Sequence, residues 1–306
     1  RLFILLRRKL FILWSLIDMM AKSLQSKLVL ISGGSSGIGL ATAKRMAREG
    51  ASFLILARDE EKLTNARELI LREAVSNDQF VETLSVDMRN YEELRNKLVP
   101  ILDRLGTPDY AMHSAGVVYP ALFEDITIEQ FHWMMDTNYF AAVNLFQIII
   151  PRMKARRSGH VIAMGSASSF IAIWGYSAYS GSKYAIRGLM ETLRCELKPF
   201  NIQTSIVFPP DTDTPQLAYE NQFKPAITKE VSGTIKPLSA DFVADKIYRG
   251  VMKNQYQIIP DRDTQLTYKA AHILGTGIFK VLDMVTDKAI KKYGLESKNI
   301  YTEENK

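Results

Sequence analysis

Short apolar segments alternate along the chain with longer segments in which apolar residues recur at helical spacing. The apolar segments predict strands at residues 27–32, 52–57, 82–87, 109–114, 160–166, 202–208 and 255–259. The helical spacing predicts helices at residues 37–49, 60–74, 91–105, 128–156, 178–198 and 240–253. Nearly continuous apolar strands joined by helices are typical of a parallel sheet that is covered on both faces. The pattern therefore predicts a doubly wound α/β fold with seven parallel strands.

Three stretches can be separated within this organisation. No repeat or low-complexity linker interrupts the alternation, so residues 22–260 are predicted to form a single domain. Inside it, residues 209–237 contain Pro and Thr and lack clear periodicity, which is typical of a functional loop, and we predict a substrate loop there. Residues 261–306 are predicted to form a helical tail, which either lies on a membrane surface or packs on its own protein.

The first 21 residues form a separate leader. Residues 1–17 are apolar but are interrupted by Arg7, Arg8 and Lys9, so neither apolar run is long enough to span a bilayer. Two interpretations stay open: a basic segment that lies on a membrane surface, or a leader that is not native to the protein. The leader is set aside in predicting the fold.

Composition narrows the classes of function. Hydrophobic residues make up 47% of the 306 positions and charged residues 24%, as in an ordinary globular protein. The net charge of +6 is spread along the chain, which argues against a nucleic-acid partner. The four histidines are isolated and predict no metal site. The one cysteine, Cys195, excludes an internal disulfide and favours a reducing, cytoplasmic location.

A glycine-rich segment follows the first predicted strand. Residues 32–39 read Ser-Gly-Gly-Ser-Ser-Gly-Ile-Gly and open the next predicted helix. Glycines at such a turn let the backbone approach a pyrophosphate, which faces the amides at the helix N-terminus. The alternative is a tight turn that binds nothing. The predicted cofactor contacts in this loop are Gly33, Ser35, Ser36, Gly37 and Ile38.

The ends of the second and third predicted strands carry charges that bear on the choice of cofactor. Arg58 and Lys62 stand where an NAD-binding protein would place a carboxylate for the ribose 2′-hydroxyl. A cationic pair without a repelling carboxylate suits the 2′-phosphate of NADP, so we expect NADPH; a solvated helix start is the alternative. Asp87 is predicted to accept a hydrogen bond from the adenine amino group, or else to cap the helix that starts near Asn90.

One tyrosine and one lysine have the spacing of a catalytic pair. Lys183 follows Tyr179 by four residues, so both side chains share a helix face and the ammonium is expected to lower the pKa of the phenol. Tyr179 would then serve as the general acid for a carbonyl oxygen whose carbon receives hydride. An ordinary amphipathic helix face is the alternative.

Ser166 and Asn138 complete the candidate catalytic set. Ser166 ends the fifth predicted strand, at the sheet edge where ligands of α/β proteins bind, and its hydroxyl is expected to reach the same carbonyl oxygen. Ser168 and Ser169 compete for this role but fall past the predicted strand end. Asn138 is predicted either to order a water for proton relay or to be a helix-interior amide bonded to backbone.

Together these residues resemble the short-chain dehydrogenase/reductase family, over residues 28–260. The family's glycine loop matches residues 32–39, with Ser in place of Thr, and its active-site Asn, Ser, Tyr and Lys match in order and spacing. The resemblance implies a Rossmann-type fold, an NADP-dependent oxidoreductase, a homo-oligomer, and a second role for Lys183 in holding the nicotinamide ribose. His113 replaces the first residue of the family's Asn-Asn-Ala-Gly, which removes a side chain that normally supports the sheet.

Three segments resemble one branch of this family, the reductases of 3-ketodihydrosphingosine. They are residues 178–183, 185–189 and 208–215, the last of which reads Phe-Pro-Pro-Asp-Thr-Asp-Thr-Pro. The likeness implies that a long-chain keto lipid is reduced to dihydrosphingosine in sphingolipid synthesis. It also implies a site on the cytosolic face of a membrane, the endoplasmic reticulum in a eukaryote. The chain departs from the branch at Gly165, where a second Ser is usual, and lacks the branch's C-terminal hydrophobic spans.

Other functions stay open at this point. Another reductase of the family would act on 3-oxoacyl thioesters or steroids, and a protein of a different class would bind NADPH without catalysis. The presence of Ser166, Tyr179 and Lys183 favours an enzyme. Asp211 and Asp213 follow two prolines in the substrate loop and are predicted to pair with the ammonium of a keto base. Their alternative role is to cap a turn or the next helix.

Overall fold

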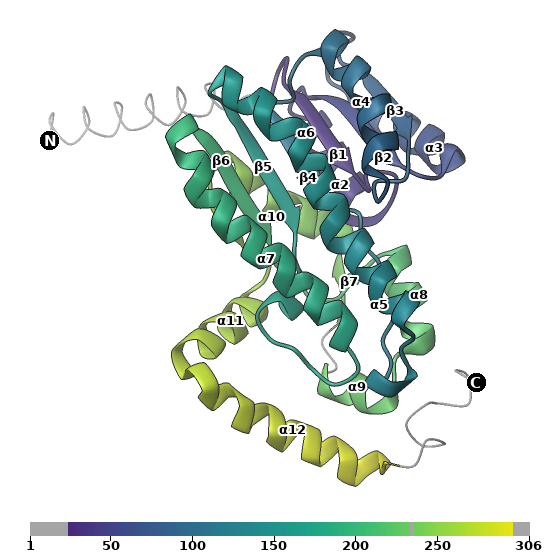
Figure 1. Ribbon diagram of the computed structural model, residues 1–306, viewed down its shortest axis with the longest axis vertical. Helices are drawn as coiled ribbons and strands as arrows, with labels where there is room; N and C mark the ends of the chain where they lie inside the picture. The colour runs from purple at the N-terminus through teal and green to yellow at the C-terminus, as the bar shows by residue number, and fades with distance from the viewer. Residues whose placement is uncertain (1–23, 233–235, 296–306) are drawn as a thin grey trace, which may run out of the picture.

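A computed structural model describes residues 24–232 and 236–295 of the chain. Its core is a seven-stranded sheet in the order β3-β2-β1-β4-β5-β6-β9, in which every neighbouring pair is parallel (Figure 1). The predicted doubly wound parallel sheet is therefore confirmed. The strands are β1 (Leu28–Ser32), β2 (Ser52–Ala57), β3 (Val81–Ser85), β4 (Tyr110–His113), β5 (Gly159–Met164), β6 (Ile202–Val207) and β9 (Gln257–Ile258).

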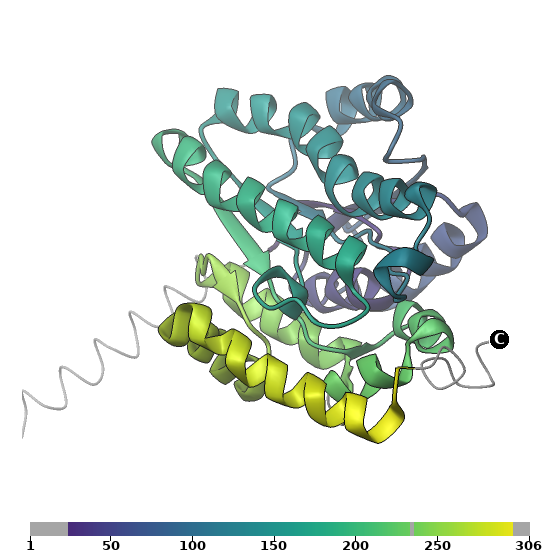
Figure 2. The ribbon, with the colours of Figure 1, turned by 60° about the horizontal axis from the view of Figure 1, so that its bottom comes forward.

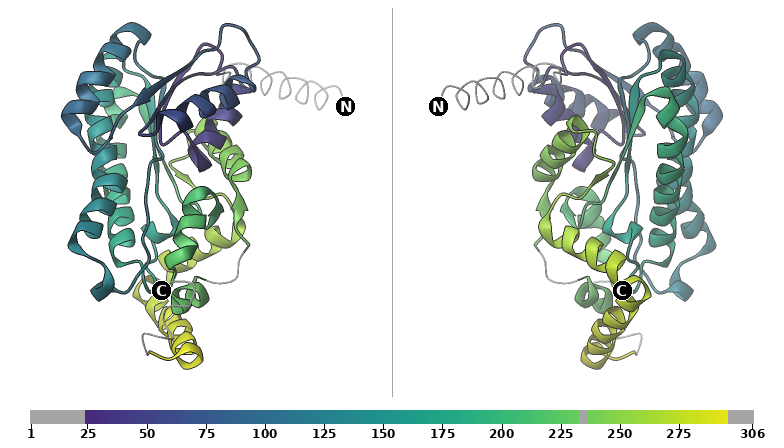
Figure 3. Two further views of the ribbon diagram at one scale, coloured as in Figure 1. Left: turned by 90° about the vertical axis from the view of Figure 1, so that its right-hand side faces the viewer. Right: turned by 90° about the vertical axis from the view of Figure 1, so that its left-hand side faces the viewer.

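Helices cover both faces of the sheet, because the side chains on both faces of its strands are apolar (Figure 3). On β1, Val29 and Ile31 pack with α2, α3 and α10, whereas Leu30 packs on the opposite side with α4, α6 and α7. The strand order reverses between β1 and β4, and the C-terminal ends of these strands open a crevice there. The covering helices are α2 (Gly37–Ala47), α3 (Glu60–Leu71), α4 (Tyr91–Leu105), α6 (Ala141–Arg156), α7 (Ser177–Leu197) and α10 (Ala240–Met252).

The crossover between β4 and β5 differs from the single helix predicted at residues 128–156. It consists of α5 (Ile128–Met135), a π-helical turn (Asp136–Phe140) and α6. The hydrophobic period runs on through the turn, so the sequence pattern does not reveal it. The turn carries Asn138, whose side chain is buried.

Two helices occupy more than half of the described residues at positions 209–237, which the poor periodicity of this stretch did not predict, while its role as a substrate loop stays a prediction. Thr214 caps its first helix by accepting a hydrogen bond from the Leu217 amide, and Pro215 occupies the first turn, where a proline fits. The short strand β7 pairs in parallel with β8 and holds the entry to this helix near the sheet. The elements are β7 (Thr212–Asp213), α8 (Pro215–Phe223), α9 (Ala226–Val231) and β8 (Leu238–Ser239).

Two further helices, α11 (Arg262–Leu274) and α12 (Ile278–Tyr293), form an arm where the helical tail was predicted (Figure 2). The arm returns to the substrate side of the molecule, where α12 contacts α9. There Lys292 lies 2.8 Å from the Glu230 carboxylate, which also accepts a hydrogen bond from Tyr293. No helix in residues 24–232 or 236–295 has the length and apolar character needed to cross a bilayer. The predicted leader lies outside the described residues.

Candidate active site

A pocket of about 620 Å³ follows the C-terminal edge of the sheet. It is lined by the glycine loop and the ends of β2 and β3, and it continues to α8 and to Leu282 of α12. Ser166, Tyr179 and Lys183 line the same pocket. Of the predicted cofactor and catalytic residues, Asn138 alone does not contribute to this lining. The structure thus brings the candidate cofactor residues and the candidate catalytic residues to one cavity.

The glycine loop forms a cradle that side chains would fill. Gly33 has a φ of +71°, and a Cβ there would lie 2.5 Å from the backbone nitrogen of Ala115. Gly37, the first residue of α2, also has a positive φ of +54°. The side chain of Ser36, which precedes α2, makes no capping hydrogen bond, so the first amides of the helix are left for a ligand. A pyrophosphate fits this cradle.

The corner after β2 holds the two predicted cations together with a carboxylate that was not predicted. Arg58 and Lys62 line the pocket, and Asp59 lines it between them. Asp59 caps α3 by accepting a hydrogen bond from the Lys62 amide, and its Oδ2 lies 3.3 Å from Lys62 Nζ. The expectation of a corner without a carboxylate is therefore wrong. Because the Lys62 side chain is paired and 65% exposed, Arg58 is the stronger candidate to bind a phosphate.

Asp87 lines the pocket just after β3 and is bound to a residue that was not predicted. Arg89 donates to both of its oxygens, with Nε 3.0 Å from each and Nη2 2.6 Å from Oδ2. The guanidinium holds the pKa of the Asp87 carboxyl below its ordinary value. The alternative role of Asp87 as a helix cap is wrong, because the Asn90 side chain caps α4 by accepting from the Glu93 amide. Arg89 also lines the pocket, and its place two residues after Asp87 was the available signal.

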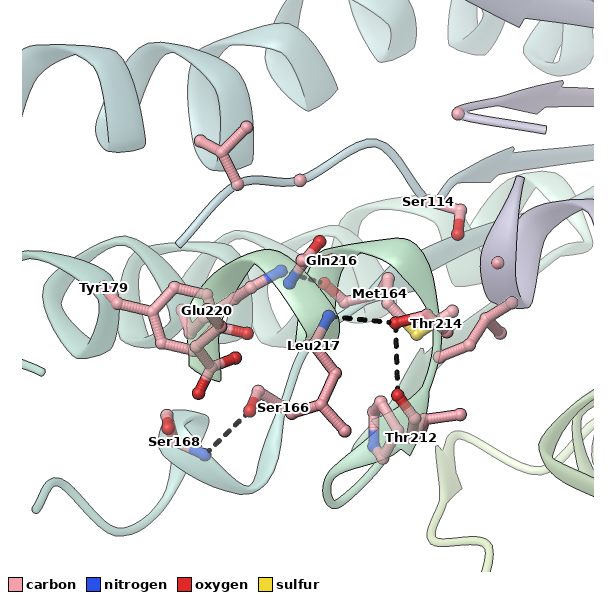
Figure 4. A pocket seen from close by; sticks show the side chains of 18 of the residues that line it. Ser114, Met164, Ser166, Ser168, Tyr179, Thr212, Thr214, Gln216, Leu217 and Glu220 are labelled. Carbon is pink, nitrogen blue, oxygen red and sulfur yellow. Dashed lines mark hydrogen bonds between the residues drawn. The ribbon is translucent and has the colours of Figure 1, made fainter. Parts of the chain in front are cut away.

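Ser166 and Tyr179 face the same cavity from different elements (Figure 4). Ser166 lies two residues past β5, and not at the strand end as predicted, and it caps the short 3₁₀ turn Ala167–Ser169. Its Oγ accepts a hydrogen bond from the Ser168 amide, and its amide donates to Ser169 Oγ, both at 3.1 Å. The two competing serines therefore hold Ser166 in place. In α7, Lys183 Nζ lies 5.6 Å from the centre of the Tyr179 ring.

Burial, and not the lysine, controls the acidity of Tyr179. Burial raises the pKa of Tyr179 well above its ordinary value, while a hydrogen bond with the Ser166 hydroxyl lowers it. The predicted lowering by Lys183 is wrong, since Lys183 Nζ donates to the Met164 carbonyl at 3.0 Å and burial lowers the pKa of this lysine to about 8. The phenol is therefore protonated at neutral pH and has a proton to donate to a carbonyl oxygen, and the hydrogen bond with Ser166 offsets part of the loss of acidity that burial causes.

The side chain of Asn138 is fully used in holding the backbone. Its Oδ1 accepts from the Val117 amide at 2.7 Å, and its Nδ2 donates to the Val117 carbonyl and to Ser182 Oγ, both at 2.9 Å. Of the two predicted roles, the geometry favours the amide bonded to backbone. Asn138 joins the π turn to the segment after β4 and to α7, next to Lys183.

His113 bridges two strands at the position where the family has an asparagine. Its Nδ1 lies 2.9 Å from Ser32 Oγ, which links the end of β4 to the end of β1. Burial lowers the pKa of His113 to about 3, so the imidazole is neutral at ordinary pH. A hydrogen bond that supports the sheet is therefore present despite the replaced residue.

The end of the pocket beside α8 has several apolar lining residues and contains a buried carboxylate that was not predicted. Glu220 lines it, and the Tyr176 hydroxyl donates a hydrogen bond to Glu220 Oε1. Lys224 Nζ lies 2.9 Å from the same oxygen. The sequence Thr214-Pro215 is typical of a helix start, and it could have been used to predict that Glu220 lies on a helix. The apolar residues here are Ile171, Ile173, Leu217, Val231 and Leu282.

The two aspartates predicted to meet the substrate are placed differently from one another. Asp211 lines the pocket, with its Oδ2 3.3 Å from Lys224 Nζ, whereas Asp213 is exposed and outside the pocket lining. Neither caps α8, because Thr214 does so, and the capping alternative is wrong in this respect.

A comparison with known protein families decides what this arrangement is. The family model described as short chain dehydrogenase matches residues 27–225. The chain belongs to the short-chain dehydrogenase family. It is therefore an oxidoreductase that works with a nicotinamide cofactor, and the predictions of family, fold and nicotinamide cofactor are confirmed.

Curated relatives match most of this family member. The 3-ketodihydrosphingosine reductase of Bos taurus is 36% identical over 229 residues, which is 74% of this chain and 69% of the relative. The enzyme of the same name from Dictyostelium discoideum is 30% identical over 290 residues, which is 90% of this chain and 87% of the relative. A solved short-chain dehydrogenase from Sphingobium yanoikuyae, in complex with NADPH, aligns with a TM-score of 0.70 at 24% identity. It covers 83% of this chain and 95% of its own, and this likeness shows the fold alone.

Proposed function

We propose that the protein reduces the keto group of 3-ketodihydrosphingosine to dihydrosphingosine with NADPH, in sphingolipid synthesis. The observation that carries the proposal is the continuous pocket, in which Ser166 and Tyr179 lie with both the glycine loop and the apolar end beside α8. A long-chain base fits such an apolar end. The relatives from Bos taurus and Dictyostelium discoideum, which bear the name of this activity, support the same substrate.

Tyr179 and Ser166 are assigned to the carbonyl oxygen. The bound nicotinamide supplies the hydride that forms the new bond to the carbonyl carbon. Tyr179, which is protonated at neutral pH, donates its hydroxyl proton to the carbonyl oxygen. Ser166 donates a hydrogen bond to the same oxygen as negative charge develops on it. Lys183, one helical turn from Tyr179, would hold the nicotinamide ribose, while Asn138 anchors α7 through Ser182.

The cofactor is assigned to the other end of the pocket. The pyrophosphate would be held at the start of α2 by the pocket-lining residues Gly33, Ser35, Ser36, Gly37 and Ile38. The Gly33 amide donates to the Leu56 carbonyl, so this residue would give close approach of the backbone and not a hydrogen bond from its amide. Arg58 pairs with the 2′-phosphate, with Lys62 as a weaker second cation because Asp59 already neutralises part of its charge. Asp87, held by Arg89, accepts the hydrogen bond from the adenine amino group.

The substrate is tested by comparing two ketones of equal chain length. NADPH oxidation is followed with 3-ketodihydrosphingosine and with a 3-oxoacyl thioester. We expect turnover of the keto base in clear preference to the thioester. Preference for the thioester would replace the substrate but keep the reaction, whereas NADPH binding without turnover of any ketone would contradict an enzyme.

We also assign a peripheral membrane contact to the arm formed by α11 and α12. Such a contact on the cytosolic face would give a lipid substrate a short path to the pocket, which Leu282 of α12 lines. Exposed apolar side chains on the arm are accompanied by exposed lysines, Lys269, Lys280 and Lys288, which suit an anionic lipid surface. The largest exposed apolar side chains are those of Leu266, Ile273, Phe279 and Met284.

Vesicle co-sedimentation tests this contact. We expect the protein to sediment with vesicles that contain anionic lipid, and the double variant Ile273→Asp, Phe279→Asp to stay in the supernatant with its activity on a detergent-dispersed ketone retained. Equal sedimentation of both proteins would place the membrane contact elsewhere.

A homo-oligomer is proposed through the outer face of the π turn and α7. Phe140 and Tyr184 are 46% and 44% exposed on segments that contact each other. A Cβ at Gly181 or Gly188 would meet nothing within 4 Å, so a second copy can approach this face of α7 closely. Light scattering after size exclusion should show an oligomer that Tyr184→Glu dissociates, and a monomeric native protein would contradict it.

A further inference from the structure

Glu220 brings a buried carboxylate into the substrate end of the pocket. It follows Gln216 by four residues on α8, and both of these side chains and Leu217 line the pocket. The residue is 7% exposed. Figure 4 shows Glu220 in the cavity that also holds Tyr179 and Ser166. A carboxylate at this depth requires partners, because an unpaired charge is costly to remove from water.

The partners of Glu220 are concentrated on one of its two oxygens. Tyr176 donates its hydroxyl hydrogen bond to Oε1, and Lys224 Nζ lies 2.9 Å from the same atom. Neither of these two interactions between described residues involves Oε2. The second oxygen is thus the one left for a ligand in the pocket.

The charges around Glu220 do not balance. Lys224, whose side chain is 3% exposed, serves both Glu220 and Asp211, so the ionised cluster has one cation for two carboxylates. Burial raises the pKa of Glu220 above its ordinary value, and Lys224 opposes this shift. Glu220 and Lys224 are buried, whereas the Asp211 side chain is 48% exposed, so the deficit of positive charge falls on Glu220 and is reduced by a further cation. A cationic group of a ligand bound next to Glu220 can supply it.

The negative charge of Glu220 lies close to Tyr179, the residue assigned to protonate the carbonyl oxygen. The ring centres of Tyr176, which donates to Glu220, and Tyr179 are 5.8 Å apart, and the charges of Glu220 and Asp211 both raise the pKa of the Tyr179 phenol. A cation that pairs with Glu220 therefore belongs to the same part of the substrate as the ketone. An ammonium on the carbon next to the carbonyl meets this requirement.

We infer that Glu220 is the residue that selects 2-amino-3-ketones, by binding the substrate ammonium through its free oxygen. Tyr176 and Lys224 are positioning residues that fix the orientation of its carboxylate. This inference rests on the function proposed above, and it moves the ammonium site from Asp211 and Asp213 to α8. Asp213 lies outside the pocket lining, and the Asp211 side chain is 48% exposed, so solvent screens its charge more than that of the buried Glu220.

The test measures a ratio of specificities. Values of kcat/KM are determined with NADPH for 3-ketodihydrosphingosine and for the same ketone with hydrogen in place of the amine. We expect the native enzyme to favour the amine about 10- to 100-fold, the range of a charge-assisted hydrogen bond, and Glu220→Gln to lose most of this preference. The matched control is Asp213→Asn, which changes an exposed carboxylate of the same loop and should keep the native ratio. Because a ratio is compared, a general loss of activity does not imitate the effect.

The outcomes separate this inference from the proposed function. A native ratio in Glu220→Gln overturns the role of Glu220, while the function stands. If the native enzyme turns over neither ketone, the proposed function fails first and the ammonium site falls with it. Titration with NADPH shows whether Glu220→Gln is folded. Should it be unfolded, Tyr176→Phe, which removes one hydrogen bond to Oε1 and keeps the carboxylate, must lower the ratio several-fold, and an unchanged ratio would again overturn the assignment.

Discussion

The two ends of the pocket use charge in opposite ways. At the cofactor end, Arg58, Lys62 and Asp87 stand at the rim, where solvent screens them, and the backbone of the glycine loop shapes the site. At the substrate end, Glu220 and its partner Lys224 are nearly fully buried, and Glu220 brings its carboxylate into the pocket. Exposed pairs contribute little and tolerate change, whereas breaking a buried pair is costly. The cofactor end therefore spreads recognition over many exchangeable contacts, and the substrate end depends on few.

Tyr179 lies between the two ends, so its removal should separate catalysis from binding at either. We expect Tyr179→Phe to lower kcat at least ~10²-fold, because the proton donor is lost, with the Kd for NADPH nearly unchanged. Single-turnover NADPH oxidation and a fluorescence titration of the cofactor measure the two quantities. A rate near that of the native enzyme would place the proton donor elsewhere.

At the cofactor end, two substitutions rank the exposed cations. Arg58→Ala should weaken NADPH binding by about 1.5–3 kcal/mol, the value of a hydrogen bond to a charged group, and spare NADH. Lys62→Ala should cost under ~1 kcal/mol, since Lys62 is exposed and paired with Asp59. Calorimetric titration of each variant with both cofactors checks the order. Equal losses for NADPH and NADH would remove the 2′-phosphate from this corner.

The smallest expected effect is on the pH dependence of stability, and it involves buried histidines in the strands beneath both ends of the pocket. Burial lowers the pKa of His113 and of His160 to about 3, whereas an unfolded histidine titrates near 6.5. As pH falls below 6.5, only the unfolded state takes up these protons, so the stability that both histidines contribute above that pH is lost towards pH 3. His113→Asn removes one of the two groups. Between pH 7 and 5.5, we expect the free energy of unfolding to fall about 1 kcal/mol less in this variant than in the native protein.

Urea unfolding of both proteins at the two pH values measures this difference. His160, which is bound to Ser205 on the neighbouring strand, remains in both and serves as an internal reference. Parallel losses of stability in the two proteins would show that His113 takes up a proton in the folded state.

Much of the cofactor end could be predicted from sequence because its signals are local. Parallel strands bring Gly33, Arg58 and Ser166 to one sheet edge, and the four-residue spacing sets Tyr179 beside Lys183. The substrate end could not be predicted in the same way. Tyr176 and Glu220 are 44 positions apart, and their contact depends on how α8 packs over the pocket. The acidity of Tyr179 was predicted wrongly for the same reason, since burial is a property of the folded chain and not of helical spacing.

The strand order also affects how the protein folds while it is being synthesised on the ribosome. The central strand β1 pairs with β2 and β4, and all four strands of β3-β2-β1-β4 have been synthesised once His113 has emerged. The residues of α8, the arm and the edge strand β9 follow about a hundred residues or more later. Because chains fold from the N-terminus during synthesis, we expect the crevice for the nucleotide to form before the cavity for the lipid exists. NADPH in the cell can then act as a folding ligand of the nascent chain, stabilising its first half while the second is still being made.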